Sequence, residues 1–227
     1  VAAVITVEID KHLYQLASEE LIDFDNVTML QQDALKNKNR FNENILASVE
    51  ANLRENGHFK LVANLPYNIA TPVISNLLAC KIPPESMTVT IQKELAERIT
   101  AKPSTKNYNH LSVWIQSQCV AEIVRIMPPS VFWPQPKVES AIIHLKLDEA
   151  RRARIPDLPF FHTFNRSLFF HRRKFLRSVV ISAMKTQLDK AQVDASIAEV
   201  GLRGDQRAEQ LSVENILALC EAIRSRL

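Results

Sequence analysis

The chain has 227 residues, which is enough for one domain of ordinary size and a small second one. Hydrophobic residues make up 46% of it and charged residues 23%, a balance typical of a soluble globular protein. No run of about 18 apolar residues is present, so the sequence excludes a membrane-spanning helix. The net charge of +3 is too small to indicate a partner.

Cysteine usage predicts a reduced, cytoplasmic protein. The three cysteines, Cys80, Cys119 and Cys220, lie far apart in the sequence, and no Cys-x-x-Cys pair occurs. We therefore expect free thiols and no metal site.

Strands alternate with helices through the first 150 residues. The apolar patterns predict strands over residues 1–10, 26–33, 59–64, 87–92, 120–127 and 138–147. They predict helices over residues 11–22, 42–55, 72–80, 93–101 and 110–119, the third capped by Thr71 with Pro72 at its first position. This order predicts an α/β domain over residues 1–150 with a mostly parallel sheet, whose last two strands form an antiparallel pair at one edge.

From about residue 151 the strand pattern disappears. Helical patterns follow over residues 160–170, 174–188, 194–200 and 212–225. We therefore predict a small all-helical C-terminal domain over residues 151–227.

Polar side chains end three of the expected strands. Glu8 and Asp10 end the first, Asp33 the second and Asn64 the third. Ligands of open α/β sheets bind outside the carboxyl ends of the strands, and a carboxylate there commonly accepts hydrogen bonds from ribose hydroxyls. Any one of these residues alone is better explained as a solvated acid or amide at a strand end. Three at one edge favour a nucleotide-like cofactor.

A cofactor site of that kind also needs a glycine-rich turn about 20 residues before the ribose carboxylate. The three glycines, Gly57, Gly201 and Gly204, are not placed to supply it. Because Val1 opens directly in an expected buried strand, we expect the chain to begin inside the domain, with the turn and a preceding strand before residue 1.

The segment Asn64-Leu65-Pro66-Tyr67 suits chemistry on an exocyclic amine. The lone pair of such an amine is delocalised into the base, and two hydrogen-bond acceptors can draw the nitrogen towards a tetrahedral shape. The side chain of Asn64 and the carbonyl of Leu65 can be that pair, while Pro66 fixes the backbone and Tyr67 offers a ring face. The alternative is a strand that simply ends in a turn.

Two other features fit a nucleic-acid substrate. The stiff segment "FWPQPK" can present Phe132 as a second wall for a flipped base, although Phe132 packed beneath the loop is the simpler explanation of this segment alone. Residues 151–177 carry eight basic residues against one acid, Asp157. This cluster indicates either a phosphate-binding surface or a solvated helix face.

Several segments, in order and spacing, resemble the KsgA-type ribosomal RNA small-subunit adenine dimethyltransferases. The segments are "TVEID", "QQDAL", "VANLPYNIATPVI", "IQKELAERI", "LSVWIQ", "PPSVFWPQPKVESAIIHL", "FHRRKFLRS" and "RAEQLSVENILAL". The resemblance covers essentially the whole chain. It implies a Rossmann-like domain that uses S-adenosylmethionine to transfer two methyl groups to N6 of each of two adjacent adenosines near the 3′ end of small-subunit rRNA, during ribosome biogenesis.

The resemblance also implies residue roles. Glu8 and Ile9 would hold the cofactor ribose, and Asp33 and Ala34 its adenine, while Asn64 would lie between cofactor and target.

On the acceptor side, Asn64, Leu65, Pro66 and Tyr67 would form the catalytic segment, and Phe132 would stack on the target base. Four basic residues would contact RNA phosphates: Lys137, Arg172, Arg173 and Lys174. The partner would be small-subunit rRNA or the 30S precursor particle, met by a monomer.

The sequence differs from the family pattern in one respect, and two other functions remain as alternatives. The family's glycine-rich loop and the strand before it are missing, so the sheet should have a gap between the strands that end at Glu8 and Asn64. We assign the activity to the intact protein. The alternatives are a large-subunit rRNA adenine N6-methyltransferase and an RNA-binding assembly factor with impaired catalysis. A DNA adenine methyltransferase is more distant, because no such helical tail is expected there.

Overall fold

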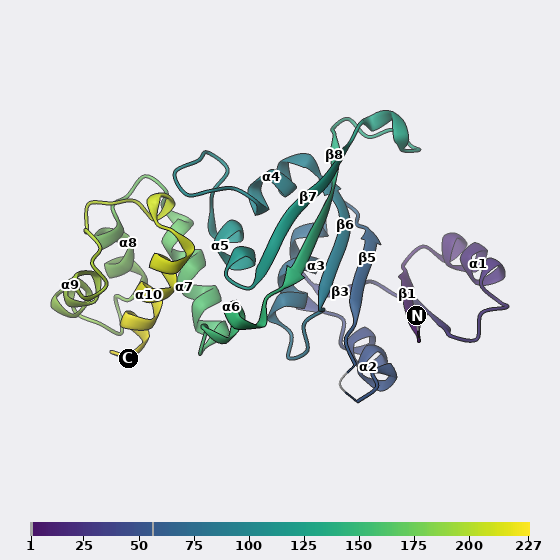
Figure 1. The fold of residues 1–227 in the computed structure, drawn as a ribbon, viewed down its shortest axis with the longest axis horizontal. Helices are drawn as coiled ribbons and strands as arrows, with labels where there is room; N and C mark the ends of the chain where they lie inside the picture. Colours follow the sequence, from purple (N-terminus) through teal and green to yellow (C-terminus); the bar gives the residue numbers. More distant parts are fainter. Residues whose placement is uncertain (1, 56) are drawn as a thin grey trace.

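A four-stranded sheet forms the centre of the computed structural model, which describes residues 2–55 and 57–227 (Figure 1). Its strands lie in the order β5-β6-β8-β7. Their bounds are Lys60–Asn64 for β5, Ser86–Gln92 for β6, Cys119–Met127 for β7 and Ser140–Leu147 for β8. β5 and β6 are parallel, whereas β8 runs antiparallel to both β6 and β7. The predicted antiparallel pair at one edge is therefore confirmed, but only one pairing within this sheet is parallel.

The N-terminal strands form a separate sheet. β1 (Val4–Glu8) pairs in parallel with β2 (Val27–Gln31), and α1 (Lys11–Glu20) connects them. Figure 1 draws this unit beside the free edge of β5. β1 and β5 do not pair, so the expected gap between the strands ending at Glu8 and Asn64 is confirmed for the described residues. A short hairpin of β3 (Leu35–Asn37) and β4 (Arg40–Phe41), which the sequence patterns missed, follows β2.

Helices surround the central sheet and then form the C-terminal half. The first group comprises α2 (Glu43–Asn52), α3 (Ala70–Ala79), α4 (Lys93–Ile99) and α5 (His110–Gln116). α4 packs against β6 and β8, and α5 against β7. The second group comprises α6 (Glu149–Ala153), α7 (Leu158–Phe170), α8 (Leu176–Ala183), α9 (Lys190–Glu199) and α10 (Val213–Arg224). No helix within the described ranges is both long and apolar enough to cross a membrane.

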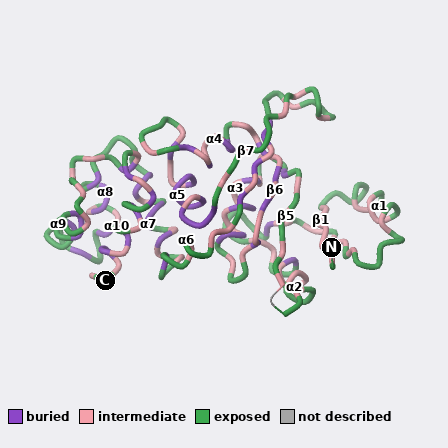
Figure 2. Tube along the Cα trace, viewed as in Figure 1, coloured by how far each residue is buried: buried purple, intermediate pink, exposed green. Residues whose placement is uncertain are grey.

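The hydrophobic core runs through the central sheet into the helical half. Alternating residues of β6 and β8 point into it, as the period-two pattern requires, and Trp114 and Phe161 join α5 to α7 as stacked rings 6.1 Å apart. Figure 2 shows the buried positions concentrated there, whereas the β1–α1 unit is drawn as intermediate or exposed. In α1, Leu13 and Leu16 remain 55% and 58% exposed. The central sheet and the C-terminal helices thus share one core, and β1, α1 and β2 lie outside it.

The predicted start of α3 was wrong. α3 begins at Ala70 with Ile69 as its N-cap, so Thr71 is not the cap. The carbonyl of Pro66 accepts from the amides of Ile69 and Ala70 and starts the helix earlier, and Pro72 still lies in the first turn, where its missing N–H is tolerated.

The basic segment His171–Lys174 lies in a turn between α7 and α8, and α8 begins at Leu176, two residues after its predicted start. The amide of Lys174 donates to the carbonyl of His171, and the amide of Leu176 donates to that of Gln206, which draws the backbone away from α7.

Candidate active site

The end of β5 presents the predicted catalytic segment at an edge of the central sheet. Asn64 is the last residue of β5, opposite Thr90 of β6, and its side chain is exposed. The amide of Leu65 still donates to the carbonyl of Thr90 at 3.1 Å, which anchors the backbone beyond the strand. The turn that begins at Pro66 then leads into α3. This segment is therefore held at both ends, by the sheet and by the helix.

Two hydrogen-bond acceptors belong to consecutive residues of this segment. Among the described residues, neither the side chain of Asn64 nor the carbonyl of Leu65 has a hydrogen-bond partner. Leu65 is only 8% exposed, so burial of its side chain holds the residue in place. Its backbone carbonyl lies at the edge of the candidate site. Neighbouring acceptors on a fixed backbone are what an amine with two hydrogens requires.

The side chain of Tyr67 is held by a hydrogen bond to the first residue of β8. Its phenolic oxygen lies 2.7 Å from the hydroxyl oxygen of Ser140, the first residue of β8. Ser140 is fully buried and lies opposite Gln92, at the end of β6. The sequence patterns missed Ser140 as a site residue. Its only signal was a serine placed directly after the proline-rich loop, at the start of an alternating strand.

The loop between β7 and β8 carries Phe132 and leaves the same end of the sheet (Figure 1). Its base is fixed by an ion pair of 2.7 Å between Lys93 and Glu139 and by the amide of Lys93, which donates to the carbonyl of Glu139. Phe132 is half-buried, and Trp133 is 96% exposed. No ring contact joins Phe132 to Tyr67 among the described residues. The two rings thus belong to one end of the sheet but do not touch.

Carboxylates end the strands of the N-terminal sheet. Glu8 Oε1 accepts from the amide of Asp10 at 2.8 Å, and Asp10 caps α1, where backbone hydrogen bonds lower the pKa of its carboxyl group. Asp33 Oδ1 accepts from the amide of Leu35 at 2.9 Å. The amide of Gln32 donates to the carbonyl of Glu8, so the ends of β1 and β2 remain paired. Glu8 and Asp33 therefore leave neighbouring strand ends, as predicted, but Asn64 belongs to the other sheet.

The remaining oxygens of these carboxylates suit a nucleoside. Glu8 Oε2 and Asp33 Oδ2 have no hydrogen-bond partner among the described residues, and they can accept from hydroxyl or amine groups. The side chain of Ile9 is 64% exposed beside them, and the carbonyl of Ala34 accepts from the amide of Asn42. The free carboxylate oxygens of Glu8 and Asp33 are thus available as hydrogen-bond acceptors. Side-chain groups of the described residues form no cluster suited to a metal ion.

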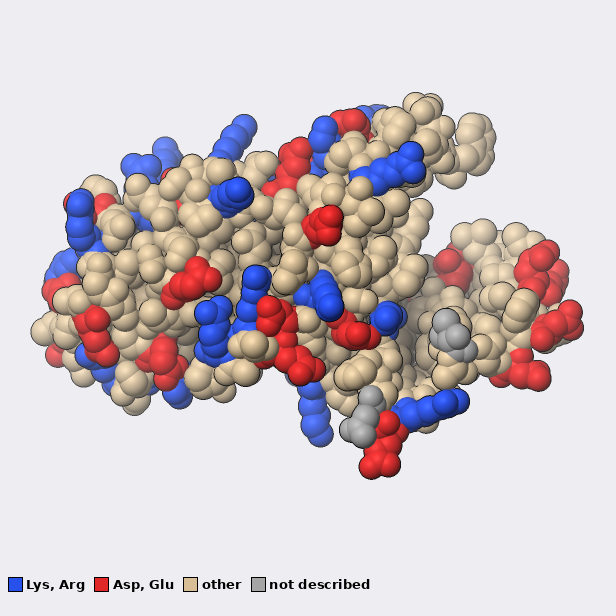
Figure 3. All heavy atoms as spheres, viewed as in Figure 1, with Lys and Arg blue, Asp and Glu red and all other residues tan. Residues whose placement is uncertain are grey.

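Much of the basic cluster holds the protein together rather than facing a ligand. Arg152 Nη1 donates to the carbonyl of Leu78 at 2.6 Å, and Arg177 forms an ion pair with Asp194 at 2.6 Å. On the face drawn in Figure 3, basic and acidic side chains alternate over the helical end. The solvated or structural explanation therefore holds for part of the cluster.

Three of the four predicted RNA contacts remain without a partner. Arg172 forms an ion pair with Glu209, whereas Arg173, Lys174 and Lys137 are exposed and have no ion pair among the described residues. These three can bind a phosphate without breaking an ion pair, whereas Arg172 would exchange one.

Known proteins that are similar to this chain are ribosomal RNA methyltransferases. Residues 1–225 match the family described as "Ribosomal RNA adenine dimethylase". The chain is 38% identical over 221 residues to "Ribosomal RNA small subunit methyltransferase A" of Clostridium acetobutylicum, covering 97% of this chain and 75% of that protein. It is 35% identical over 228 residues to the protein of the same name from Streptococcus equi subsp. zooepidemicus, covering 98% and 75%.

Solved structures share the fold. A dimethyladenosine transferase from Plasmodium falciparum superposes with a TM-score of 0.80 at 20% identity, covering 99% of this chain and 82% of that one. The 23S rRNA methyltransferase ErmE superposes with a TM-score of 0.64 at 20% identity, covering 98% and 82%. The chain thus shares the Rossmann-like fold of these methyltransferases. Within that class, the chain belongs to the ribosomal RNA adenine dimethylase family.

Proposed function

We propose that this protein dimethylates N6 of two adjacent adenosines near the 3′ end of small-subunit rRNA, with S-adenosylmethionine as the methyl donor. Family membership and the names of its curated relatives support the reaction class and the rRNA substrate. The observation that carries the proposal is the pair of acceptors at the end of β5, the Asn64 side chain and the Leu65 carbonyl, braced beside Tyr67.

The acceptor pair activates the amine by position. Hydrogen bonds from the two amine hydrogens to Asn64 and to the carbonyl of Leu65 pull the nitrogen out of conjugation and aim its lone pair away from them. Pro66 holds the carbonyl in place, because its ring fixes the backbone that follows Leu65. Glu8, Ile9, Asp33 and Ala34 would hold S-adenosylmethionine, which when bound would supply the electrophilic methyl group that this nitrogen attacks. The protein contributes orientation and electrostatic stabilisation, both of which are large terms in catalysis.

Aromatic rings hold the flipped base. Tyr67 forms one wall, with its ring orientation fixed by Ser140, and Phe132 forms the other when the loop between β7 and β8 closes over the base. On the donor side, Glu8 and Ile9 bind the cofactor ribose, while Asp33 and Ala34 bind its adenine. The unpartnered carboxylate oxygens of Glu8 and Asp33 support these roles.

The RNA lies across both halves of the protein. Lys137 in the loop between β7 and β8 and the turn of Arg172, Arg173 and Lys174 bind phosphates. We propose that residues 1–150 act as the methyltransferase domain and residues 151–227 as the RNA-binding domain. The substrate is the small-subunit precursor particle, and the protein acts on it as a monomer in the cytoplasm.

Mass mapping of methylated adenosines tests the function. Particles of the 30S type that lack the modification are incubated with the full-length protein and S-adenosylmethionine, and their rRNA is digested and sequenced by mass. We expect two neighbouring N6,N6-dimethyladenosines near the 3′ end of the small-subunit rRNA. Methylation of large-subunit rRNA instead, or binding to the particle without methylation, would favour one of the two alternatives and contradict the proposal.

A further inference from the structure

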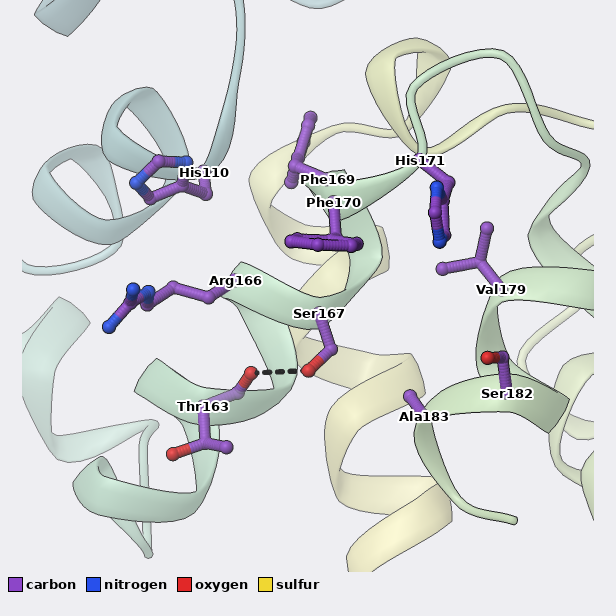
Figure 4. A pocket seen from close by; sticks show the side chains of 10 residues that line it. All are labelled: His110, Thr163, Arg166, Ser167, Phe169, Phe170, His171, Val179, Ser182 and Ala183. Atoms are coloured by element: carbon purple, nitrogen blue, oxygen red, sulfur yellow. Dashed lines mark hydrogen bonds between the residues drawn. The ribbon is translucent and has the colours of Figure 1, made fainter.

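A cavity in the helical half has no role in the proposed reaction. It has a volume of about 790 Å³ and lies between the start of α5, the outer side of α7 and α8 (Figure 4). None of the residues at the ends of β1, β2 or β5 lines it. Cavities of about 300–1,000 Å³ are of the size that bind small molecules or single groups of a larger ligand. This cavity is therefore large enough for one nucleotide and separate from the candidate active site.

The charge of the cavity is positive and uncompensated. Arg166 of α7 is exposed, and its guanidinium has no ion pair or hydrogen bond to any described residue. No carboxylate is among the described residues that line the cavity. Arg172 and Arg177, by contrast, are each held by an acid. An unpaired guanidinium beside a cavity without acids suits a phosphate group.

An exposed aromatic ring lies one helical turn beyond Arg166 on α7. Phe170, the last residue of α7, is 80% exposed, although large apolar side chains are usually covered. Its ring meets that of His171 edge to face, with ring centroids 4.8 Å apart. Figure 4 shows the Phe170 ring edge-on between Arg166 and His171. A ring supported at its edge and open on its face is a platform on which a base can stack.

Neutral polar groups complete the lining. Burial, with help from nearby Arg166, lowers the pKa of His110 to about 4, so its ring is neutral at pH 7 and can donate and accept hydrogen bonds. Ser167 donates its hydroxyl hydrogen to the carbonyl of Thr163 at 3.0 Å, which leaves the oxygen of Ser167 available as an acceptor. The cavity thus offers one cation, one stacking surface and neutral hydrogen-bonding groups.

We propose that this cavity binds an unpaired nucleotide of the substrate RNA, distinct from the adenosines that are methylated. The base stacks on Phe170, the phosphate binds Arg166, and His110 and Ser167 face the base or the sugar. Because Phe170 leads directly into the turn of Arg173 and Lys174, the next phosphates of the same strand reach those side chains. This inference rests on the proposed rRNA substrate and adds a second anchoring site to it.

Photochemical crosslinking tests the base contact. The full-length protein is bound to unmodified 30S-type particles and irradiated with short-wave ultraviolet light, and the nucleotide adducts are mapped by mass spectrometry. We expect an adduct on Phe170 or His171 that is lost in Phe170→Ala and reduced in Phe170→Leu, which keeps an apolar side chain but no ring. Both variants should fold normally because Phe170 is exposed.

Salt-dependent binding tests the phosphate contact. Arg166→Ala should weaken RNA binding by about 3–10-fold and reduce the slope of log K against log salt by about one unit. Arg154→Ala removes an exposed arginine that does not line the cavity, and it should change neither quantity.

Three outcomes would overturn the inference. The first is adducts confined to Tyr67 or Phe132. The second is an Arg166→Ala variant that behaves like Arg154→Ala. The third is a lowered salt slope without an adduct at Phe170 or His171, which would leave a bare phosphate contact. If the wild-type protein bound no small-subunit rRNA at all, the proposed function would fail with it. If one of the three outcomes occurred while the wild type still bound and methylated small-subunit rRNA, only the second site would be disproved and the proposed function would stand.

Discussion

The phenolic oxygen of Tyr67 lies 2.7 Å from the hydroxyl oxygen of Ser140, although 73 residues separate them in the sequence. This contact joins the turn after β5 to the start of β8, across the end of β6. Ser140 is fully buried, so its hydroxyl has no access to solvent and the hydrogen bond fixes the ring of Tyr67. The orientation of Tyr67, which forms one wall of the proposed base site, therefore depends on Ser140, a residue distant in the sequence.

Removal of this contact should slow methyl transfer without preventing RNA binding. Ser140→Ala frees the Tyr67 ring, and we expect the rate constant of methyl transfer to fall by about 3–10-fold, as for the loss of one hydrogen bond of about 1 kcal/mol. Tyr67→Phe should behave similarly. Single-turnover assays on 30S-type particles measure this rate. Ser178→Ala, on the exposed side of α8, is the matched control, and equal rates for it and Ser140→Ala would contradict a positioning role.

In the basic turn, Arg173 and Lys174 should contribute more to RNA binding than Arg172. Arg173→Ala with Lys174→Ala should flatten the salt dependence of binding by about two units of slope, one for each phosphate lost. Arg172→Ala should have less effect, because Arg172 is already bound to Glu209 and to the carbonyl of Lys106. Titrations at several salt concentrations, with Lys190→Ala as the exposed control, decide the point. An unchanged slope in the double variant would mean that this turn is only a solvated surface.

Arg152 should be important for stability rather than for binding. Its guanidinium donates to the carbonyls of Leu78 and Cys80 and to the side chain of Gln118, so it ties α6 to the ends of α3 and α5. Partial burial lowers its pKa, which shows the desolvation that these hydrogen bonds offset. Arg152→Met keeps the apolar stem and leaves those groups unpaired.

We expect the free energy of unfolding to fall by about 2–4 kcal/mol in this variant. Urea unfolding followed by circular dichroism measures it. Arg154→Met, two residues away and exposed, should change it by less than about 0.5 kcal/mol. Equal urea midpoints of unfolding for Arg152→Met and Arg154→Met would contradict the role assigned to Arg152.

His110 should make the protein less stable in mild acid. Burial, then the charges of Arg166, His162 and Arg98, lower its pKa from 6.5 to about 4 in the folded protein. Between those values the unfolded chain binds more protons than the folded one, so the free energy of unfolding falls as the pH drops from about 6.5 to about 4. The loss should be on the order of 2 kcal/mol, because the ring is only partly buried.

Unfolding at pH 7 and at pH 4.5 measures this loss. His110→Gln should remove a large part of it, whereas His12→Gln, at an exposed position in α1, should retain the wild-type dependence. The same pH dependence in His110→Gln as in the wild type would contradict the assignment. His162 adds to the wild-type effect in the same direction, because burial lowers its pKa as well.

Local patterns in the sequence predicted much of the fold. The alternation in residues 86–92 and 140–147 and the apolar faces of α7 and α10 depend only on neighbours in the chain, and these elements formed where expected. The hairpin of β3 and β4 was missed, because its strands are too short to carry a pattern. The start of α8 was predicted two residues too early, because the hydrogen bonds from residues 176 and 177 to residues 206 and 204 are formed with a distant part of the chain.

The candidate site was predictable in part for the same reason. Asn64 and Tyr67 lie in one continuous motif, and Glu8 and Asp33 follow recognisable strands, so strand topology alone brings them to sheet edges. Ser140 and the ion pair of Lys93 with Glu139 depend on the pairing of β6 with β8, which no local pattern specifies.

Single-turnover methyl transfer by Asn64→Ala tests the central claim most directly. The account predicts a fall of about 10²–10³-fold in the rate, as for other losses of a preorganised polar group, with RNA affinity within about twofold of the wild type. Asn64→Asp, which keeps acceptor oxygens, should retain more of the rate than Asn64→Ala. Wild-type turnover by Asn64→Ala on 30S-type particles would contradict the proposed activation of the amine.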